Sequence, residues 1–341
     1  MNFNSTHLNV FSSGLFSRKI FLRLFFVLLL SFIASLFSGC INLNMVARTQ
    51  PLVENVISGD ADAKILVIDI SGFIKNQKKK SFFDRQEGVL MTARIREELK
   101  VASEDEDIKA IILRIDTPGG EVATTDIIHR EITQFKKKKN IPVVAMLMGL
   151  ATSGGYYIAV SADTIIAMPT TITGSVGVIV FKVDASGFMK KLGLVNESIK
   201  SGELKDIGSP LRGQTQKELE IMQSLVDSLF LRFFELVKNA RTIKDADLKL
   251  VKDGRVFTSK QALDIGLVDS VGYFEEAVSA AKDAAGIKDA KLITYSRQGV
   301  YKNNFYSALP EVKLFNEFNL LNIDASLGNA HAPSFMYLWS P

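Results

Sequence analysis

The chain is poor in the residues that build metal centres, disulfides and histidine-based catalysis. Its 341 residues include one cysteine and three histidines. A single cysteine excludes a disulfide within the chain. The histidines, at positions 7, 129 and 331, are too far apart in the sequence to suggest a metal site. Of these, His129 alone is placed for catalysis, and a surface position on a helix suits it better. We therefore expect no metal.

The body of the chain also lacks a strong charge of either sign. The formal net charge is +4, and three of the positive charges lie in the first 40 residues, which hold no acid. Nucleic-acid-binding domains are usually strongly basic, so no nucleic acid is expected as a partner. The spacing of Gly174 and Gly177 is too short for a dinucleotide or P-loop motif. No cofactor is expected.

One long apolar run stands near the N-terminus, from Ile20 to Phe37, with Arg18 and Lys19 before it. This pattern is typical of an export signal or a membrane anchor, and basic residues on its N-terminal side place the body outside the cytoplasm. The run ends at Cys40 in a sequence that resembles a bacterial lipobox, except at Phe37. Either Cys40 is lipidated after cleavage, or the run remains as a membrane helix. In both cases residues 1–40 are the signal peptide or membrane anchor that directs the protein to the membrane, and residues 41–62 form a polar tether.

From residue 63 the chain alternates between strand and helix patterns. This alternation favours an α/β fold with right-handed crossovers. Residues 298–341 lack sustained periodicity, so we expect a tail that is poorly ordered or docked on a neighbour. Apolar runs predict strands at 64–70, 109–115, 141–148, 164–168, 195–199 and 291–295, and helical spacing predicts helices at 88–102, 121–139, 184–192, 214–240 and 273–285.

Ser153 is the most distinctive serine, because it follows a strand pattern and precedes Gly154 and a helix. The free N–H groups at a helix N-terminus favour developing negative charge, which suits a nucleophile. The alternative is that Thr152 and Ser153 only cap the helix. If Ser153 is a nucleophile, the shortage of histidine makes a lysine its expected base.

Four short segments, in this order along the chain, resemble the signal peptide peptidase A family of serine proteases. The resemblance covers a protease domain of residues 63–297 and implies the fold of caseinolytic protease subunits and crotonases, a superhelix of repeated strand-strand-helix units behind an N-terminal membrane anchor. The chain length is similar to that of the short members of the family. The segments are Asp116–Gly120, Ala151–Tyr157, Ile172–Val178 and Lys200–Asp206.

The resemblance implies a role for five residues. Ser153 takes the place of the nucleophile and Lys205 that of the general base. Ser175 takes the place of a serine that orients the lysine, and the backbone N–H groups of Gly120 and Gly154 would form the oxyanion hole. A lysine acts as a base only when neutral, so the site must bury it and lower its pKa toward about 7 to 8.

Lys200 competes with Lys205 for the role of base, because both lie in one predicted loop. Lys205 follows the apolar Leu204, whereas Lys200 precedes Ser201 and Gly202, which suggests a more exposed amine. Since burial is what makes a lysine neutral, Lys205 is the preferred base.

The expected function is that of a membrane-tethered serine endopeptidase of the bacterial cell membrane, with its catalytic domain on the periplasmic side. As the resemblance implies, it would degrade cleaved signal peptides and other extended apolar peptides, as a ring-forming homo-oligomer. One alternative is a crotonase-like acyl-CoA enzyme, which would use a carboxylate and have no need of Ser153. The other is a catalytically inactive membrane scaffold, against which the presence of both Ser153 and Lys205 argues.

Overall fold

The computed structural model describes residues 22–30, 51–76, 90–297, 304 and 335–339. The chain divides into two compact units, residues 1–49 and 50–341. In the first unit, residues 22–30 form a helix with exposed side chains, and Cys40 lies outside the described residues. Within the described ranges, no helix has the length and apolar character needed to cross a membrane.

The second unit is built on a nine-stranded sheet with the order β1-β11-β2-β3-β5-β6-β10, and β7 and β9 extend it beside β5. The pairs from β11 through β10 are parallel. Its central strands are almost entirely buried, which explains their continuous runs of Ile, Leu and Val. The strands are β1 (Val53–Ser58), β2 (Lys64–Ser71), β3 (Ile108–Thr117), β5 (Val143–Thr152), β6 (Thr164–Ala167), β7 (Ile172–Gly174), β9 (Val256–Thr258), β10 (Ser270–Val271) and β11 (Lys291–Ser296).

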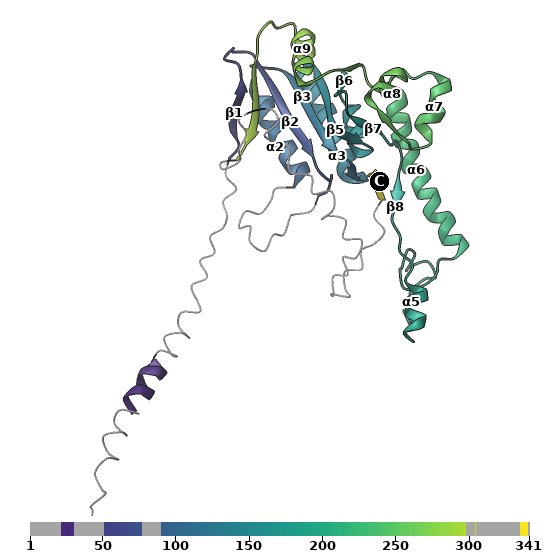
Figure 1. Ribbon diagram of the computed structural model, residues 1–341. Coiled ribbons are helices and arrows are strands. Elements are labelled where there is room, and N and C mark those ends of the chain that lie inside the picture. The colour runs from purple at the N-terminus through teal and green to yellow at the C-terminus, as the bar shows by residue number, and fades with distance from the viewer. Residues whose placement is uncertain (1–21, 31–50, 77–89, 298–303, 305–334, 340–341) are drawn as a thin grey trace, which may run out of the picture. The chain divides into compact units, whose positions relative to one another are not determined.

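Helices cover both faces of this sheet (Figure 1). Along β2, Leu66 and Ile68 enter one hydrophobic cluster, whereas Ile65 and Val67 enter the other. The first cluster includes residues of three helices of the N-terminal half and of three later helices, and the second includes residues of a single helix near the C-terminus. The mixed α/β fold predicted from the sequence is thus confirmed. The helices are α2 (Met91–Glu104), α3 (Val122–Lys139) and α4 (Gly154–Ala159) on one face and α9 (Phe274–Ala285) on the other.

β5 changes partner along its length. It pairs with β6 over residues 144–147 and with β7 over residues 150–152. β7 then pairs with β9 in the antiparallel direction. The carboxyl ends of β5 and β7 therefore lie side by side, and Ser153 and Ser175 are close to these two strand ends.

Two predictions made for the second unit need correction. The span expected to be a tether up to residue 62 contains β1, which pairs with β11 and makes residues 53–58 part of the folded body. No strand forms over the predicted range 195–199. Residues 241–272 form two helices, α7 (Asp245–Lys252) and α8 (Ser259–Asp264), and the two short strands β9 and β10.

An arm formed by residues 181–231 carries α5 (Ser186–Lys191) and most of α6 (Gln216–Ala240), and α5 lies well away from the sheet (Figure 1). The C-terminal part of α6 packs into the core through Phe233 and Val237, which are fully buried. The rest of the arm leaves many apolar side chains in solvent. These are Phe181, Val183, Phe188, Leu192, Leu194, Val195, Ile199, Leu211, Leu219, Leu225 and Leu231.

A second, three-stranded sheet has the order β4-β12-β8. Its strands are β4 (Gly119–Glu121), β8 (Ile179–Val180) and β12 (Phe335–Leu338). The middle strand comes from the C-terminal tail, most of which lies outside the described residues. We expected this tail to be poorly ordered or docked on a neighbour, but residues 335–338 pack on their own chain, with Tyr337 fully buried in the larger cluster.

Candidate active site

Ser153 lies at a tight turn between β5 and α4. Its backbone angles, φ 52° and ψ −111°, are unusual for a residue other than glycine. Two backbone hydrogen bonds hold the turn: the Ser153 N–H donates to the Gly174 carbonyl at 2.7 Å, and the Tyr157 N–H donates to the Ser153 carbonyl at 2.9 Å. A strained strand-to-helix turn of this kind is a known way to present a nucleophilic serine.

Ser153 is only 1% exposed, so its hydroxyl is shielded from water. This hydroxyl nevertheless makes no hydrogen bond among the described residues. The hydroxyls of Thr125 and Thr152 are in the same state. Leaving a buried hydroxyl without a partner costs about 1 to 3 kcal/mol, so native proteins seldom keep one without a use for it. The unpartnered Ser153 hydroxyl is therefore free to react or to accept a further polar group.

The Gly119–Gly120 loop packs against Gly154, the residue after Ser153. A Cβ atom on Gly119 would lie 2.8 Å from the Gly154 nitrogen, and one on Gly120 would lie 2.0 Å from the Ile74 carbonyl oxygen. Side chains at these two positions would collide with backbone, so the close approach requires glycine. The sequence analysis selected Gly120 and Gly154; the structure adds Gly119 to the same contact.

The hydrogen bonds of Ile74 fix the direction of the Gly120 N–H group. The Ile74 N–H donates to the Gly119 carbonyl at 2.8 Å, and the Ile74 carbonyl accepts from the Glu121 N–H at 2.8 Å; Gly119 and Glu121 are the two neighbours of Gly120. Backbone groups of successive residues in a strand point in opposite directions, so the Gly120 N–H points to the other edge of β4. With the N–H at the start of α4, this arrangement resembles the pair of donors that an oxyanion hole needs.

Ser175 follows β7 as Ser153 follows β5. The two strands are parallel, and Thr152 is paired with Gly174, so the two serines succeed paired residues at the same end of the sheet. Ser175 shares the unusual φ of 52° and donates its N–H to the Arg255 carbonyl at 2.8 Å. The structure thus brings Ser175 close to Ser153, while its role in orienting a lysine stays a prediction.

Lys205 is not hydrogen-bonded to Ser153 within the described part of the chain, because the Ser153 hydroxyl has no partner there. Its loop joins α5 to α6 and is tied to α6 instead: Asp206 binds Arg212, which also binds Glu218 in the first turn of α6. Lys200 pairs with Asp206 at 2.8 Å. Within one chain the predicted dyad therefore makes no hydrogen bond, and Lys205 is exposed there, so a single copy does not provide the burial that the sequence led us to expect for this lysine.

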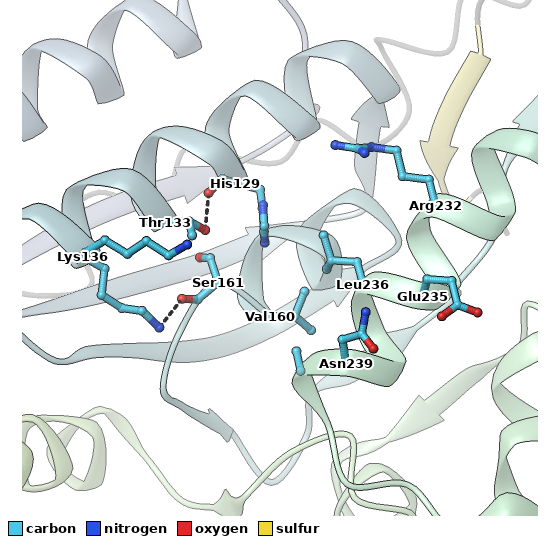
Figure 2. Close-up of a pocket in the computed structure, with 11 residues that line it drawn as sticks. His129, Thr133, Lys136, Val160, Ser161, Arg232, Glu235, Leu236 and Asn239 are labelled. Carbon is cyan, nitrogen blue, oxygen red and sulfur yellow. Dashed lines mark hydrogen bonds between the residues drawn. The ribbon is translucent and has the colours of Figure 1, made fainter.

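A cavity of about 740 Å³ lies between α3 and α6, and Ser153 does not line it (Figure 2). His129 faces it, and burial lowers the pKa of this histidine to about 4. Two of the basic residues around the cavity are already neutralised, since Arg232 pairs with Asp126 and Lys136 pairs with Asp163. His129 packs edge-on against Tyr157 with ring centres 5.3 Å apart, which gives it a packing role.

The chain matches known peptidases over most of its length. A model of peptidase family S49 matches residues 135–288, and a Clp protease model matches residues 69–173. A proposed signal peptide peptidase, SppA, of Enterococcus faecium is 30% identical over 84% of each chain. A proposed protease of Methanocaldococcus jannaschii is 30% identical over 84% of this chain and 90% of its own. The chain belongs to peptidase family S49.

Membership of S49 makes the protein a serine protease and confirms the family named from the four motifs. Protease 4 of Haemophilus influenzae is also similar, with 33% identity over 64% of this chain and 34% of that protein. Among solved structures, a membrane-bound stomatin-specific protease aligns over 70% of this chain and 100% of its own, with 16% identity and a TM-score of 0.43.

Two contacts near Ser153 had no signal in the sequence. Thr125 lies in the first turn of α3, and its hydroxyl would be 2.9 Å from a Cβ atom on Gly154. Tyr337 belongs to an apolar cluster that the sequence does reveal, but its place beside Gly119 depends on chain segments more than 200 positions apart. No local pattern encodes either contact.

Proposed function

We propose that this S49 peptidase is a serine endopeptidase in which Ser153 is the nucleophile. The observation that carries the proposal is the strained turn at Ser153, with a buried, unpartnered hydroxyl beside the Gly119–Gly120 loop. The hydroxyl oxygen attacks a peptide carbonyl and loses its proton to a neutral lysine. The backbone N–H groups of Gly120 and Gly154 stabilise the oxyanion, a contribution of about 3 kcal/mol for each donor.

The lysine then returns the proton to the leaving amine as the peptide C–N bond breaks. This step leaves an ester between Ser153 and the N-terminal part of the substrate. A water molecule, deprotonated by the same lysine, attacks the ester and releases the second product as a carboxylic acid. No group other than serine, lysine, backbone N–H and water is needed.

Lys205 is the lysine we assign to this task. Lys200 is already bound to Asp206, and Asp206 is held in turn by Arg212, so Lys200 is committed to the internal network of its loop. Lys205 follows Leu204 in the same loop and takes part in none of these bonds. Ser175 lies next to Ser153, where its hydroxyl would hold the incoming amine.

A second copy of the chain would either place its own Lys205 at the Ser153 site of the first copy or pack over the Lys205 of the first copy and bury it. The arm that carries Lys205 exposes a run of apolar side chains, among them Phe188, Leu194 and Val195, with exposures of 65%, 55% and 78%. A large exposed apolar surface marks a site of protein association. Packing between copies would remove this surface from water and place the amine in the apolar surroundings that lower its pKa. This is the role we give to the ring-forming homo-oligomer.

The apolar run Ile20–Phe37 would hold the enzyme at the bacterial membrane, with the body on the periplasmic side. Such a position favours extended apolar peptides, including cleaved signal peptides, as substrates. The naming of the Enterococcus faecium relative as a signal peptide peptidase supports this substrate class.

A covalent serine probe tests the proposal directly. A fluorophosphonate should label wild type in proportion to its turnover of an apolar peptide, and Ser153→Ala should lose both. Labelling or peptide turnover that persists in Ser153→Ala would assign the nucleophile to another residue. A wild type that neither takes the label nor cleaves peptide would favour the crotonase-like enzyme or the inactive scaffold.

A further inference from the structure

β5 carries a bulge just before the Ser153 turn. The strands β3 and β5 run in step as far as the pair Ile115 and Leu147, but the next pair is Thr117 with Ala151. Two steps along β3 therefore match four steps along β5, so β5 holds two additional residues at this point. The bulge lies where β5 exchanges β6 for β7 as its partner. Bulges next to active sites commonly re-aim a side chain.

Two side chains hold the bulge, one from β3 and one from the residue just before β7. The Asp116 carboxylate accepts a hydrogen bond from the Leu150 N–H at 2.9 Å. The Thr171 hydroxyl is fully buried and is shared between the Leu147 carbonyl, at 3.0 Å, and the Met148 carbonyl. A bulge disrupts the ladder, and a backbone polar group left without a partner is costly. Asp116 and Thr171 therefore supply partners where the neighbouring strands do not.

Asp116 connects the two halves of the proposed site. It precedes Gly120, whose N–H is one of the proposed oxyanion donors, by four residues, and the N–H that it binds belongs to β5, three residues before Ser153. The two halves are in tight contact, since a Cβ atom on Gly155 would lie 2.6 Å from the Thr117 methyl carbon. A slip at the bulge would therefore displace the Ser153 hydroxyl relative to the Gly120 N–H.

We propose that Asp116 is a positioning residue for the peptidase reaction: its hydrogen bond to the bulge of β5 sets the place of Ser153 relative to the Gly120 donor. Thr171 holds the same bulge from the other side. The proposal rests on the proposed role of Ser153 as the nucleophile. A misplacement of about 1 Å can cost about 10²-fold in rate. Because Asp116 acts through the backbone of β5, its effect should fall on kcat and leave KM little changed.

The bulge needs an acceptor oxygen from Asp116 and not a negative charge. Burial raises the pKa of the Asp116 carboxyl group, so the surroundings do not favour its ionised form. Asparagine has nearly the same shape and keeps a carbonyl oxygen that can accept from the Leu150 N–H. Asp116→Asn should therefore preserve the bulge, whereas Asp116→Ala leaves the N–H without a partner.

Asp163 provides a matched control at the other end of β5. Its carboxylate accepts from the Val143 N–H at 2.9 Å, a bond of the same kind and length as that of Asp116. Val143 begins the strand, and Ser153 follows its last residue. Asp163→Ala should therefore lower stability, as Asp116→Ala does, but leave kcat close to wild type.

Kinetics of the full-length variants test the proposal. The measurements are kcat and KM for an apolar peptide and the rate of labelling by a fluorophosphonate. We expect Asp116→Ala to lower kcat and the labelling rate about 10²-fold with KM little changed, and Asp116→Asn to stay close to wild type. The positioning role would be overturned by full activity in Asp116→Ala, by an equal loss in Asp163→Ala, or by an Asp116→Asn variant as inactive as Asp116→Ala.

Thr171→Val keeps the test decisive if Asp116→Ala does not fold. It removes the hydroxyl that holds the other side of the bulge and should lower kcat about tenfold. An unchanged kcat in folded Thr171→Val would overturn the proposal. The nucleophile is tested separately by wild type and Ser153→Ala. Labelling that does not depend on Ser153 is a failure of the proposed function, whereas labelling of Ser153 that does not depend on Asp116 is a failure of the positioning role alone.

Discussion

Ser153 and Ser175 adopt the same left-handed backbone conformation, and both follow paired residues of neighbouring parallel strands. Strain of this kind costs about 1 to 3 kcal/mol per residue and survives only where the surrounding structure enforces it. At Ser153 the enforcement comes from the Gly174 carbonyl, and at Ser175 it comes from the Arg255 carbonyl. At the scale of single residues, the site is therefore built by the backbone.

Replacing Lys205 should be as damaging as replacing the nucleophile. If Ser153 and Lys205 act as one unit, Ser153→Ala, Lys205→Ala and the double variant should each lower kcat by about 10⁴-fold or more, without adding. Lys200→Ala is the control and should cost less than about tenfold. The measurement is single-turnover cleavage of an apolar peptide. Near-normal cleavage by Lys205→Ala together with an inactive Lys200→Ala would transfer the role of base to Lys200.

Gly120 should tolerate no side chain. Gly120→Ala would put a methyl group 2.0 Å from the Ile74 carbonyl oxygen, so β4 must move. We expect the free energy of unfolding to fall by about 2 to 3 kcal/mol. Gly187→Ala in α5 is the matched control, because its methyl group meets nothing within 4 Å, and it should be neutral or slightly stabilising. Urea unfolding of both variants gives the comparison, and equal stabilities would contradict the packing argument.

His129 should make the fold less stable in mild acid. Burial lowers its pKa to about 4 from an ordinary value of 6.5. Between these two pH values the unfolded chain binds more protons than the folded chain, so the free energy of unfolding falls as the pH drops through this window. The loss should reach about 3 kcal/mol near pH 4 and be close to zero above pH 7.

The variant His129→Phe keeps an aromatic ring against Tyr157 and removes the proton-binding site. The pH dependence of its urea unfolding should be flatter than that of wild type between pH 6.5 and pH 4. Parallel curves for the two proteins would mean that His129 does not cause the acid sensitivity.

At the scale of elements, the two halves of α6 lie in different environments, one in the core and one in the exposed arm. Its C-terminal half buries Phe233 and Val237, whereas its N-terminal half exposes Leu219 and Leu225. The start of the helix is nevertheless well defined, because Thr215 and Glu218 form a capping box and Arg212 binds Glu218. These contacts keep the carboxyl pKa of Glu218 low, near 2. An ordered helix with apolar residues in water indicates a surface made for association.

A charge on the arm should separate the copies. Phe188→Glu places a carboxylate on the exposed apolar surface, where burial against a second copy would desolvate it. We expect light scattering to show a shift from oligomer to monomer and peptide turnover to fall at least tenfold. Val56→Glu is the control, because Val56 is similarly exposed but lies on β1, at the far edge of the sheet. An oligomer that is unchanged in Phe188→Glu would exclude this face as the interface.

At the scale of the whole molecule, the proposed attachment to the membrane would decide where the enzyme meets its substrates. We expect the full-length protein to fractionate with membranes and a variant that lacks residues 1–40 to be released. Recovery of the full-length protein entirely in the soluble fraction would contradict the tether. Incorporation of a lipid label that is lost in Cys40→Ser would identify the lipoprotein form, whereas a label that survives the substitution would exclude it.

Much of the fold follows from local patterns. The continuous apolar runs of β2, β3 and β5 and the helical spacing of α3 and α9 predict these elements to within a few residues. The family is likewise carried by four short motifs, each of which is contiguous in the chain. These features can be predicted from the sequence because burial of a strand, or close approach of the backbone at a glycine, constrains residues that are neighbours in the chain.

Features that depend on contacts between residues far apart in the chain were decided by the tertiary structure alone. β1 looked like a tether because its partner, β11, lies more than 200 positions away. The contact between the rings of Tyr157, Phe233 and Tyr337 joins three segments with no common pattern. The sequence by itself determined the family and the α/β class, and it predicted the serine of the proposed site. The three-stranded sheet of β4, β12 and β8 arises only when segments far apart in the chain meet.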